Sequence, residues 1–239
     1  MRKNHSKAHL LQERLSQIIA LTEPGGRLPS EPTLAKDLGV SRATLREAMR
    51  TFETQGLIRR KQGSGTYVTH PSQVFESGLE MLESIETLAA RLGLEVRMVE
   101  MRVEERPASP DEARALMLNE NASVIHVSRV IFAEKRPVAY LIDIVPNNLL
   151  NSDELDKDFS GSILDLFLER GSPDLVSSRC EITADSAPVE VAKSLGIQRG
   201  DVLLKFVSYL YSADGQVVDY SFSYFLPGYF RFHVMRRVS

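Results

Sequence analysis

Cysteine, tryptophan and long apolar runs are scarce in this sequence. It has one cysteine, no tryptophan and five histidines among 239 residues. The single cysteine, Cys180, excludes an intramolecular disulfide and any zinc site built from several cysteines. No apolar run approaches the roughly 20 residues of a membrane-spanning helix, and the basic N-terminal segment lacks the apolar core of a signal peptide. We therefore expect a soluble cytoplasmic protein, with Cys180 a buried strand residue rather than a reactive thiol.

Motifs for enzymatic chemistry are absent as well. The histidines are scattered, and none stands at a metal-ligand spacing such as HExxH. The sequence has neither the GxSxG elbow of a serine hydrolase nor the glycine-rich loop that cradles nucleotide phosphates. We therefore expect no enzyme, no metal site and no cofactor.

The charges that are present are unevenly distributed. Residues 1–70 carry 12 lysines and arginines against 6 acidic residues, whereas the rest of the chain carries 17 against 26. The net charge of −3 therefore hides a basic N-terminal part and an acidic remainder. Phosphate binding depends on the local field, so the basic part is a candidate for contact with nucleic acid.

Residues 27–69 give the basic part a recognisable pattern. They predict a helix capped by Ser30, a second helix capped by Ser41, and a basic hairpin with Gly63 at its tip, and an amphipathic helix over 8–22 precedes them. The apolar positions share one face of the two helices: Leu34, Ala35, Leu38, Leu45, Ala48, Met49 and Phe52. The other face of the second helix is polar: Ser41, Arg42, Thr44, Arg46 and Arg50. This pattern is typical of a winged helix-turn-helix that enters the major groove of DNA.

The C-terminal part alternates helices and strands, and it repeats itself. Residues 108–146 and 187–227 both read as a helix followed by two strands joined by a turn, and their final prolines are 81 residues apart. We favour an internal duplication over a chance likeness of two helix-and-hairpin units. The pattern predicts a pseudo-symmetric α+β domain with one antiparallel sheet. A further helix is expected over 75–92.

Two acidic residues, Asp143 and Asp219, lie on the repeated strands. Paired carboxylates can act as general acid and base, so an enzyme with a regulatory DNA-binding head stays open as the alternative function. We expect the two residues to be solvated strand residues instead.

The motifs LPSE, VSRATLREA and GSGTYV resemble the N-terminal signature of the GntR family of bacterial transcription regulators. FAEKRPVAYLIDIVP and DGQVVDYSFSYFLPGYFRF resemble the effector-binding UTRA domain of its HutC-type subfamily, so the likeness covers essentially the whole chain. It implies a chorismate-lyase-like fold for the C-terminal half and a homodimer. We accordingly divide the chain into a winged helix-turn-helix DNA-binding domain (1–70), a linker (71–78) and a UTRA domain for effector binding and dimerisation (79–239).

The resemblance also implies a function. The chain is expected to be a sequence-specific transcriptional regulator, and a repressor, that binds a palindromic operator in double-stranded DNA. A small metabolite in the UTRA domain would control its operator affinity.

By the same resemblance, the residues that contact DNA are Ser41, Arg42, Thr44, Arg46, Gln62 and Gly63. A guanidinium can bridge O6 and N7 of guanine, while hydroxyls and backbone amides hold phosphates. A glycine at the wing tip lets the backbone approach DNA closely because it has no side chain to clash. Pro32 stands where many relatives carry an arginine that touches DNA, so the operator sequence is expected to differ.

The effector-binding candidates are Ser84, Arg129, Ser162, Arg179, Tyr220 and Tyr224. Many relatives carry two arginines around residue 130, suited to a sugar phosphate, whereas only Arg129 remains here, and Leu141 replaces an acidic residue. A pocket with fewer charges holds a phosphate less well, so we expect a carboxylate or a less charged metabolite. Structural roles stay open: a surface salt bridge for Arg129, helix caps for Ser84 and Ser162, and packing for the tyrosines.

Overall fold

The computed structural model describes residues 2–54, 57–61, 63–69, 75–155, 159 and 161–236. The chain divides into two compact units, which we describe separately. The head comprises Met1–Val74 with Leu226–Arg231, and the body comprises Phe75–Phe225 with Phe232–Ser239. None of the helices in these described ranges is long and apolar enough to cross a membrane.

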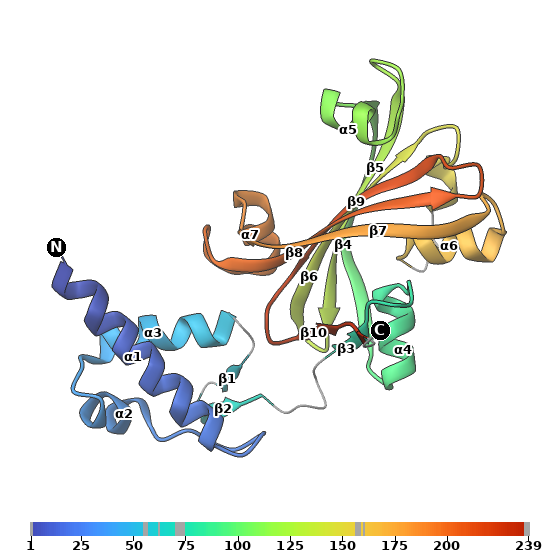
Figure 1. Ribbon diagram of the computed structural model, residues 1–239. Helices are drawn as coiled ribbons and strands as arrows, with labels where there is room; N and C mark the ends of the chain where they lie inside the picture. Colours follow the sequence, from blue (N-terminus) through green and yellow to red (C-terminus); the bar gives the residue numbers. More distant parts are fainter. Residues whose placement is uncertain are drawn as a thin grey trace. The chain divides into compact units, whose positions relative to one another are not determined.

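The head is built on three helices and a two-stranded antiparallel wing (Figure 1). Its elements are α1 (Arg2–Leu21), α2 (Glu31–Asp37), α3 (Arg42–Thr54), β1 (Ile58–Lys61) and β2 (Gly65–Val68). Ser30 caps α2 by accepting a hydrogen bond from the backbone of Thr33, and Ser41 caps α3 by accepting from the backbone of Thr44 at 3.1 Å. Both predicted helix starts are confirmed.

A single apolar cluster holds the elements of the head together. Its buried members come from α1, α2, α3 and β1 and from the segment before α2: Leu11, Leu15, Ile19, Leu28, Leu34, Ala35, Leu45, Met49, Phe52 and Ile58. Each leucine-sized side chain that is buried stabilises the fold by about 1.5–3 kcal/mol. The head therefore has a core of its own, and that core uses the apolar face of α3.

The body is a six-stranded antiparallel sheet in the order β4-β5-β6-β9-β8-β7. The strands are β4 (Val96–Pro107), β5 (Ser123–Ala133), β6 (Arg136–Pro146), β7 (Leu175–Ser186), β8 (Val202–Ser212) and β9 (Val217–Phe225). Helix α5 (Pro110–Ala115) follows β4, and α7 (Val189–Leu195) follows β7. Each half of the sheet is thus a strand, a helix and a hairpin, and the halves meet where β6 pairs with β9. The predicted repeat of helix and hairpin within one antiparallel sheet is confirmed, and each unit gains a strand.

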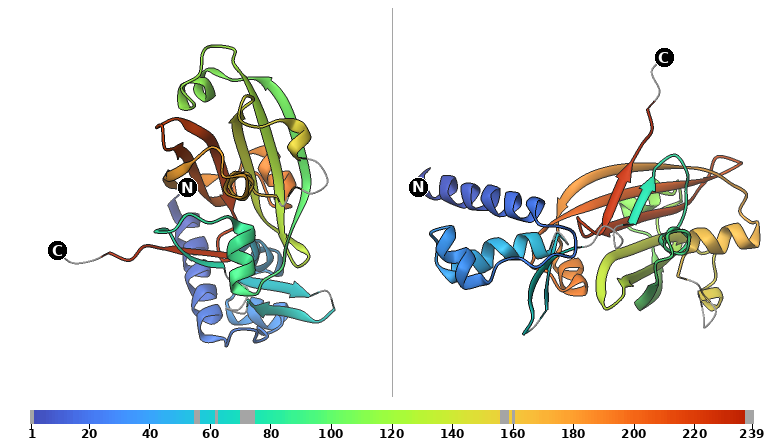
Figure 2. Two further views of the ribbon diagram at one scale, coloured as in Figure 1. Left: turned by 90° about the vertical axis from the view of Figure 1, so that its right-hand side faces the viewer. Right: turned by 90° about the horizontal axis from the view of Figure 1, so that it is seen from below.

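Different helices cover the two faces of this sheet (Figures 1 and 2). Helix α6 (Ile163–Arg170) packs through Phe167 into a cluster with Val127 and Val145. Helix α5 packs on the opposite face, in a cluster with Val124 and Ile144. Successive strand residues point to opposite faces, so the odd-numbered positions of β5 and β6 face α6.

The segment 75–92 differs from the continuous helix that the sequence predicts. Its first residues form β3 (Phe75–Gly78), which pairs with β10 (Phe230–His233), and helix α4 covers only Ile85–Leu92. Burial alternates along β3, with Phe75 buried and Glu76 exposed, as in a strand with one covered face. Four residues assigned to the linker are therefore a strand, and residues 71–74 lie outside the described part.

Candidate functional site

The start of α3 presents polar side chains to solvent. Ser41, Arg42, Thr44 and Arg46 are exposed, whereas Leu45 between them is fully buried in the core of the head. The hydroxyl of Ser41 lies 2.8 Å from that of Thr44. Hydroxyls and backbone amides at the start of a helix suit phosphate groups, so this end of α3 has the chemistry of a DNA-binding surface.

Arg46 is oriented by an ion pair with α2. Its Nε donates to Oε2 of Glu31 at 2.7 Å, and Nε of Arg60 on the wing lies 3.8 Å from the other oxygen of Glu31. The Arg46 side chain is 62% exposed, so solvent screens the pair and its contribution to stability is small. Glu31 thus positions the arginine, and the exposed guanidinium remains accessible to a base edge.

The wing tip has the backbone geometry that its glycine permits. Gly63 has a φ of +73°, a region that favours glycine, and a Cβ placed there would meet nothing within 4 Å. Behind the tip, Nζ of Lys61 lies 5.1 Å from the ring centroid of Tyr67, whose hydroxyl is 2.7 Å from that of Ser64. Gln62, the sixth predicted DNA contact, lies outside the described residues.

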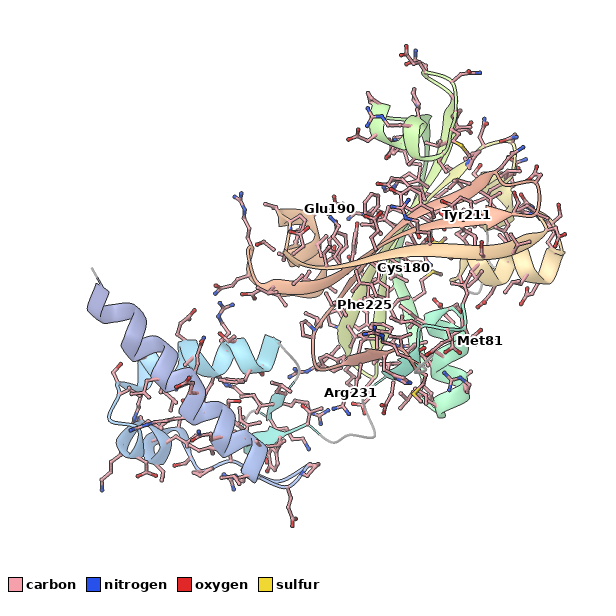
Figure 3. The ribbon with its side chains drawn as sticks, in the orientation of Figure 1. Met81, Cys180, Glu190, Tyr211, Phe225 and Arg231 are labelled. Carbon is pink, nitrogen blue, oxygen red and sulfur yellow. The ribbon has the colours of Figure 1, made fainter. Side chains whose placement is uncertain are left out.

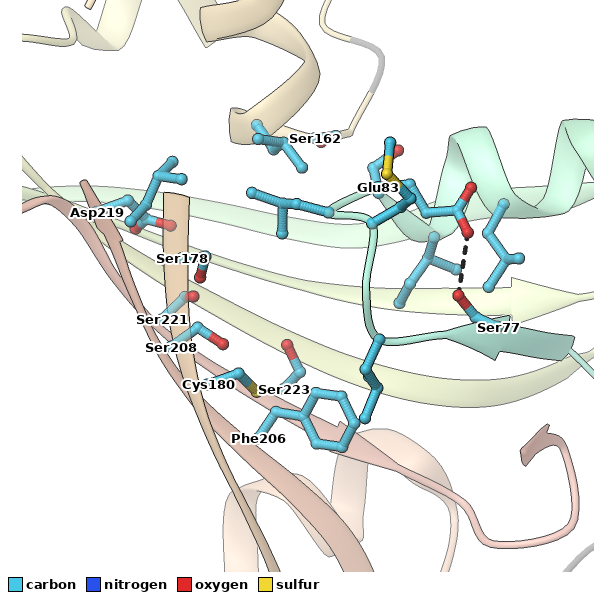
Figure 4. A pocket seen from close by; sticks show the side chains of 18 of the residues that line it. Ser77, Glu83, Ser162, Ser178, Cys180, Phe206, Ser208, Asp219, Ser221 and Ser223 are labelled. Carbon is cyan, nitrogen blue, oxygen red and sulfur yellow. Dashed lines mark hydrogen bonds between the residues drawn. The ribbon is translucent and has the colours of Figure 1, made fainter. Parts of the chain in front are cut away.

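A cavity of about 760 Å³ lies in the body, on the face of the sheet that carries α6 (Figure 4). Its volume is within the range of roughly 300–1,000 Å³ of small-molecule sites. One wall is formed by the strands, and the opposite wall by residues 77–88 and the start of α6. A row of paired residues crosses four strands on the cavity wall: Asp143, Ser221, Ser208 and Cys180.

The uncharged lining of this cavity combines aliphatic side chains with hydroxyl groups and aromatic rings. Eight serines contribute to it: Ser77, Ser84, Ser162, Ser177, Ser178, Ser208, Ser221 and Ser223. Phe206, Phe225 and Phe232 form an aromatic cluster in the lining, with ring centroids 4.6 to 5.1 Å apart. The cavity therefore suits a molecule that combines apolar and hydrogen-bonding parts.

Three of the charged groups that line the cavity form a diagonal line across three neighbouring strands. Arg129 on β5 donates to the carboxylate of Asp143 on β6, and both residues are buried. Asp143 pairs in register with Ser221, two residues from Asp219 on β9, and such diagonal neighbours are within side-chain reach. Asp219 is only 6% exposed. The expectation that the two aspartates are solvated is therefore wrong: both are buried in the cavity wall.

Burial changes the acidity of two of these carboxyl groups. It raises the pKa of Asp219 well above its ordinary value, and the neighbouring carboxylate of Asp143 adds to the shift. Burial likewise raises the pKa of Glu86, in the first turn of α4, although the charge of Arg129 opposes that shift. The cavity thus contains carboxyl groups that retain protons more readily than solvated ones.

Three of the six predicted effector-binding residues line the cavity: Ser84, Arg129 and Ser162. Ser84 and Ser162 are also the caps of α4 and α6, and Ser84 donates to Oδ2 of Asp165 at 2.6 Å. Both of the roles weighed for these serines, wall residue and helix cap, are therefore compatible. Arg129 forms a buried ion pair rather than the surface salt bridge considered as its alternative.

The other three candidates, Arg179, Tyr220 and Tyr224, do not line this cavity. The even-numbered positions around Cys180 on β7 and the odd-numbered positions around Ser221 on β9 face the cavity. Arg179, Tyr220 and Tyr224 stand between these positions, so their side chains lie on the opposite face of the sheet. Arg179 instead pairs with Glu181 and stacks on Tyr209, while Tyr220 packs against Tyr209 with ring centroids 5.0 Å apart. The structure therefore does not bring these three residues together with Ser84, Arg129 and Ser162 in this cavity.

The prediction that Cys180 is buried is wrong. Cys180 is a strand residue of β7, as expected, but it is exposed, and it lines the cavity (Figures 3 and 4). β7 is an edge strand of the sheet, which leaves it less covered than the central strands. The alternation of the sequence identifies the strand, but it does not show that this strand lies at an edge.

A DNA-binding head joined to a separate body with a ligand-sized cavity defines a class of protein, the ligand-responsive DNA-binding regulators. Two family matches agree with this assignment. Residues 8–68 match the bacterial regulatory proteins of the gntR family, and residues 91–231 match the UTRA domain. The chain therefore belongs to the GntR family, in its HutC-type subfamily with a UTRA domain, and is a sequence-specific DNA-binding transcriptional regulator.

Curated relatives and solved structures are consistent with that membership. The chain is 29% identical to the HTH-type transcriptional repressor NagR of Bacillus subtilis, over 91% of this chain and 88% of that protein. It is 32% identical to the histidine utilization repressor of Pseudomonas aeruginosa, over 76% and 71%. The crystal structure of PhnF from Mycobacterium smegmatis is similar in fold, with a TM-score of 0.65 and 19% identity over 96% of this chain and all of that one.

Proposed function

We propose that this regulator is a homodimeric repressor of a palindromic operator, and that a small metabolite in the cavity of the body controls its operator affinity. The cavity carries the proposal, because it offers a ligand-sized site in the unit that lacks the DNA-binding helix. Two relatives are named as repressors, which supports repression. A regulator of transcription works where the DNA is, which supports the cytoplasm.

For DNA we propose contacts from the exposed start of α3 and from the wing tip. The residues are Ser41, Arg42, Thr44, Arg46, Gln62 and Gly63. The arginines supply base-edge contacts in the major groove, and the hydroxyls and wing backbone supply phosphate contacts.

For the effector we propose a metabolite with little or no negative charge rather than a phosphate. Arg129 already pairs with Asp143, so its charge is largely compensated. The starts of α4 and α6 are capped by serine hydroxyls, and acidic residues, Glu86 and Asp165, occupy their first turns. These carboxyl groups oppose the binding of an anion at either helix. Of the two classes expected from the sequence, the less charged metabolite therefore fits better than a carboxylate.

Effector control predicts a measurable change in operator affinity. A ligand shifts an equilibrium only through different affinities for its two states, and typical couplings of about 1–3 kcal/mol change affinity roughly 5–150-fold. We expect a metabolite identified by native mass spectrometry of the purified protein to produce a change in this range, measured by fluorescence anisotropy with labelled operator. Residues 1–74 alone lack the cavity and should not respond. A bound metabolite that leaves operator affinity unchanged would refute the control mechanism.

Arg46→Ala is expected to weaken operator binding by about 1–3 kcal/mol and to relax sequence preference at one base pair. The reason is the exposed guanidinium, which Glu31 holds in place. Anisotropy titrations at fixed salt, against the operator and single-base variants, measure both effects. Arg199→Ala, which removes an exposed arginine of the body, is the matched control. Loss of affinity that is equal for every sequence would assign Arg46 to a phosphate instead of a base.

The alternative function, an enzyme, draws support from one observation: Asp143 and Asp219 meet in the cavity. However, the chain's family and its named relatives are regulators. In addition, Asp143 is ion-paired with Arg129, which makes it a poor general base. Incubation of the protein with its co-purified metabolite tests this alternative. Turnover that is lost in Asp219→Asn would favour the enzyme.

A further inference from the structure

We propose that the effector is an amine with an apolar tail, whose ammonium group binds Asp219 and whose tail packs against Phe206, Phe225 and Phe232. This inference rests on the proposed effector-binding function and adds the charge and shape of the ligand. It follows from a buried carboxyl group with one unsatisfied oxygen at one part of the cavity and an aromatic cluster at another.

One carboxyl oxygen of Asp219 is an unsatisfied hydrogen-bond acceptor among the residues that the structure describes. Its side chain is buried in the cavity wall, and its carboxyl group points into the cavity (Figure 4). The backbone of Ile144 and the carboxyl group of Asp143 bond to it, but Oδ1 has no hydrogen-bond partner among the residues that the structure describes. An unsatisfied buried acceptor destabilises the folded protein, and a ligand that donates a hydrogen bond to it would recover this free energy.

The charge balance around Asp219 favours a cation as that donor. The charged groups that face it are Asp143 on β6 and Arg129 on β5. Glu86 on α4 also faces Arg129, and its buried Oε1 likewise has no partner in the described ranges. Three carboxyl groups therefore lie around one guanidinium, so a cation that takes the place of a carboxyl proton would be stabilised, whereas an anion would find no uncompensated positive charge.

The aromatic cluster lies at a distance that sets the shape of the ligand. Asp219 pairs in register with Leu210 on β8, and Phe206 is four residues away along the same strand. At about 3.3 Å per strand residue, the two positions are roughly 13 Å apart. Ser208, between them on the cavity side, adds a hydroxyl group. An elongated amine with an apolar end, rather than a compact ion, matches this arrangement.

Binding would be coupled to loss of a proton. Because burial raises the pKa of Asp219 in the empty cavity, a bound ammonium group displaces a proton into solvent wherever the pH lies below that pKa. The affinity for an amine should therefore rise with pH, by up to about tenfold per pH unit below that pKa. The rise ends where Asp219 is already ionised or where the amine itself loses its charge.

Three probes with one skeleton and different head groups test the inference: phenylbutylamine, phenylbutanol and phenylbutyrate. Calorimetry with the full chain is expected to show that the amine binds at least about tenfold more tightly than the alcohol, the effect of one charge-assisted hydrogen bond, and that the acid binds most weakly. Titrations in buffers of different ionisation enthalpy should show proton release with the amine only.

Asp219→Asn keeps the shape of the side chain and removes its charge. It is expected to abolish the preference for the amine while binding of the alcohol stays within about twofold, a change worth less than 0.5 kcal/mol. Asp111→Asn, an exposed aspartate of α5, is the matched control and should leave all three affinities unchanged. Glu86→Gln is a second test inside the cavity and should also weaken the amine, which covers the case that Asp219→Asn fails to fold.

The outcomes separate this inference from the proposed function. The inference is overturned if the amine does not bind, if the acid binds as tightly, or if Asp219→Asn and Glu86→Gln both keep the preference. If the alcohol or the acid binds in the cavity and changes operator affinity, the proposed function stands and only the amine assignment fails. If the amine binds with proton release but leaves operator affinity unchanged, the amine assignment stands and regulation by this probe fails.

Discussion

Arg129→Met is expected to lower the free energy of unfolding by about 3–5 kcal/mol at neutral pH, the usual cost of removing one partner of a buried ion pair. Arg129 is 4% exposed and supplies the positive charge that faces Asp143, Asp219 and Glu86. Without it, these carboxyl groups must either stay ionised and unpaired or take up protons. Urea denaturation followed by circular dichroism measures the loss.

The size of this loss should depend on pH in a defined direction. In the variant, the buried carboxyl groups retain protons above about pH 4, where the same groups in the unfolded chain ionise. The folded state then binds more protons than the unfolded state, so the variant's stability falls as pH rises. The difference between wild type and variant should therefore shrink as the pH is lowered toward about 4.

Two further variants establish the cause. Arg129→Met combined with Asp143→Leu replaces the ion pair by apolar side chains and should recover most of the lost stability. Arg114→Met, in an exposed pair with Asp111 whose side chains are 77% and 83% exposed, should change stability by at most about 1 kcal/mol. If Arg129→Met is as mild as Arg114→Met at neutral pH, the charge of Arg129 does not stabilise the buried carboxyl groups of the cavity.

The sequence predicts the head well because local rules determine it. Ser30 and Ser41 begin helices where the capping rule places them, and apolar spacing identifies the core face of α3. The predicted repeat of helix and hairpin is also present in the observed sheet. The sequence could predict it because turn residues and the alternation of apolar and polar residues are local signals. Local rules fail in the segment 75–92, where pairing with β10, a strand more than 150 residues later, turns the first four residues into a strand.

The cavity is predicted less well because it depends on register. Tyr220 and Tyr224 share a strand with Asp219, but they lie on the other face, and the sequence does not show which face is hollow. The resemblance to relatives brought out Arg129 but not its partner, since Asp143 contacts it only through the pairing of β5 with β6. The sequence did contain one indication of the cavity: on β6 and β9, Asp143 and Asp219 stand among mainly apolar neighbours.

Full-length protein is expected to bind a two-half-site operator about 10²–10⁴-fold more tightly than residues 1–74 do, while both bind a single half-site with similar affinity. The head has its own apolar core and exposes one recognition helix. A second head therefore improves binding only if the body joins two heads in one dimer, which makes the second contact intramolecular. An operator is first selected from random DNA. Anisotropy titrations at one salt concentration then compare full-length protein with residues 1–74 on the two-half-site operator and on a single half-site.

Spacing between the half-sites separates a dimer from two independent molecules. Half-sites about 10 base pairs apart lie on one face of the duplex, and about 5 added base pairs turn the second half-site to the opposite face. The full-length protein should lose its advantage on this DNA, whereas residues 1–74 should bind as before. Circular dichroism of residues 1–74 must show a folded head for the comparison to count. If the advantage persists after the half-turn insertion, or if it never appears, the two heads do not act as a symmetric pair and the homodimer on a palindrome is disproved.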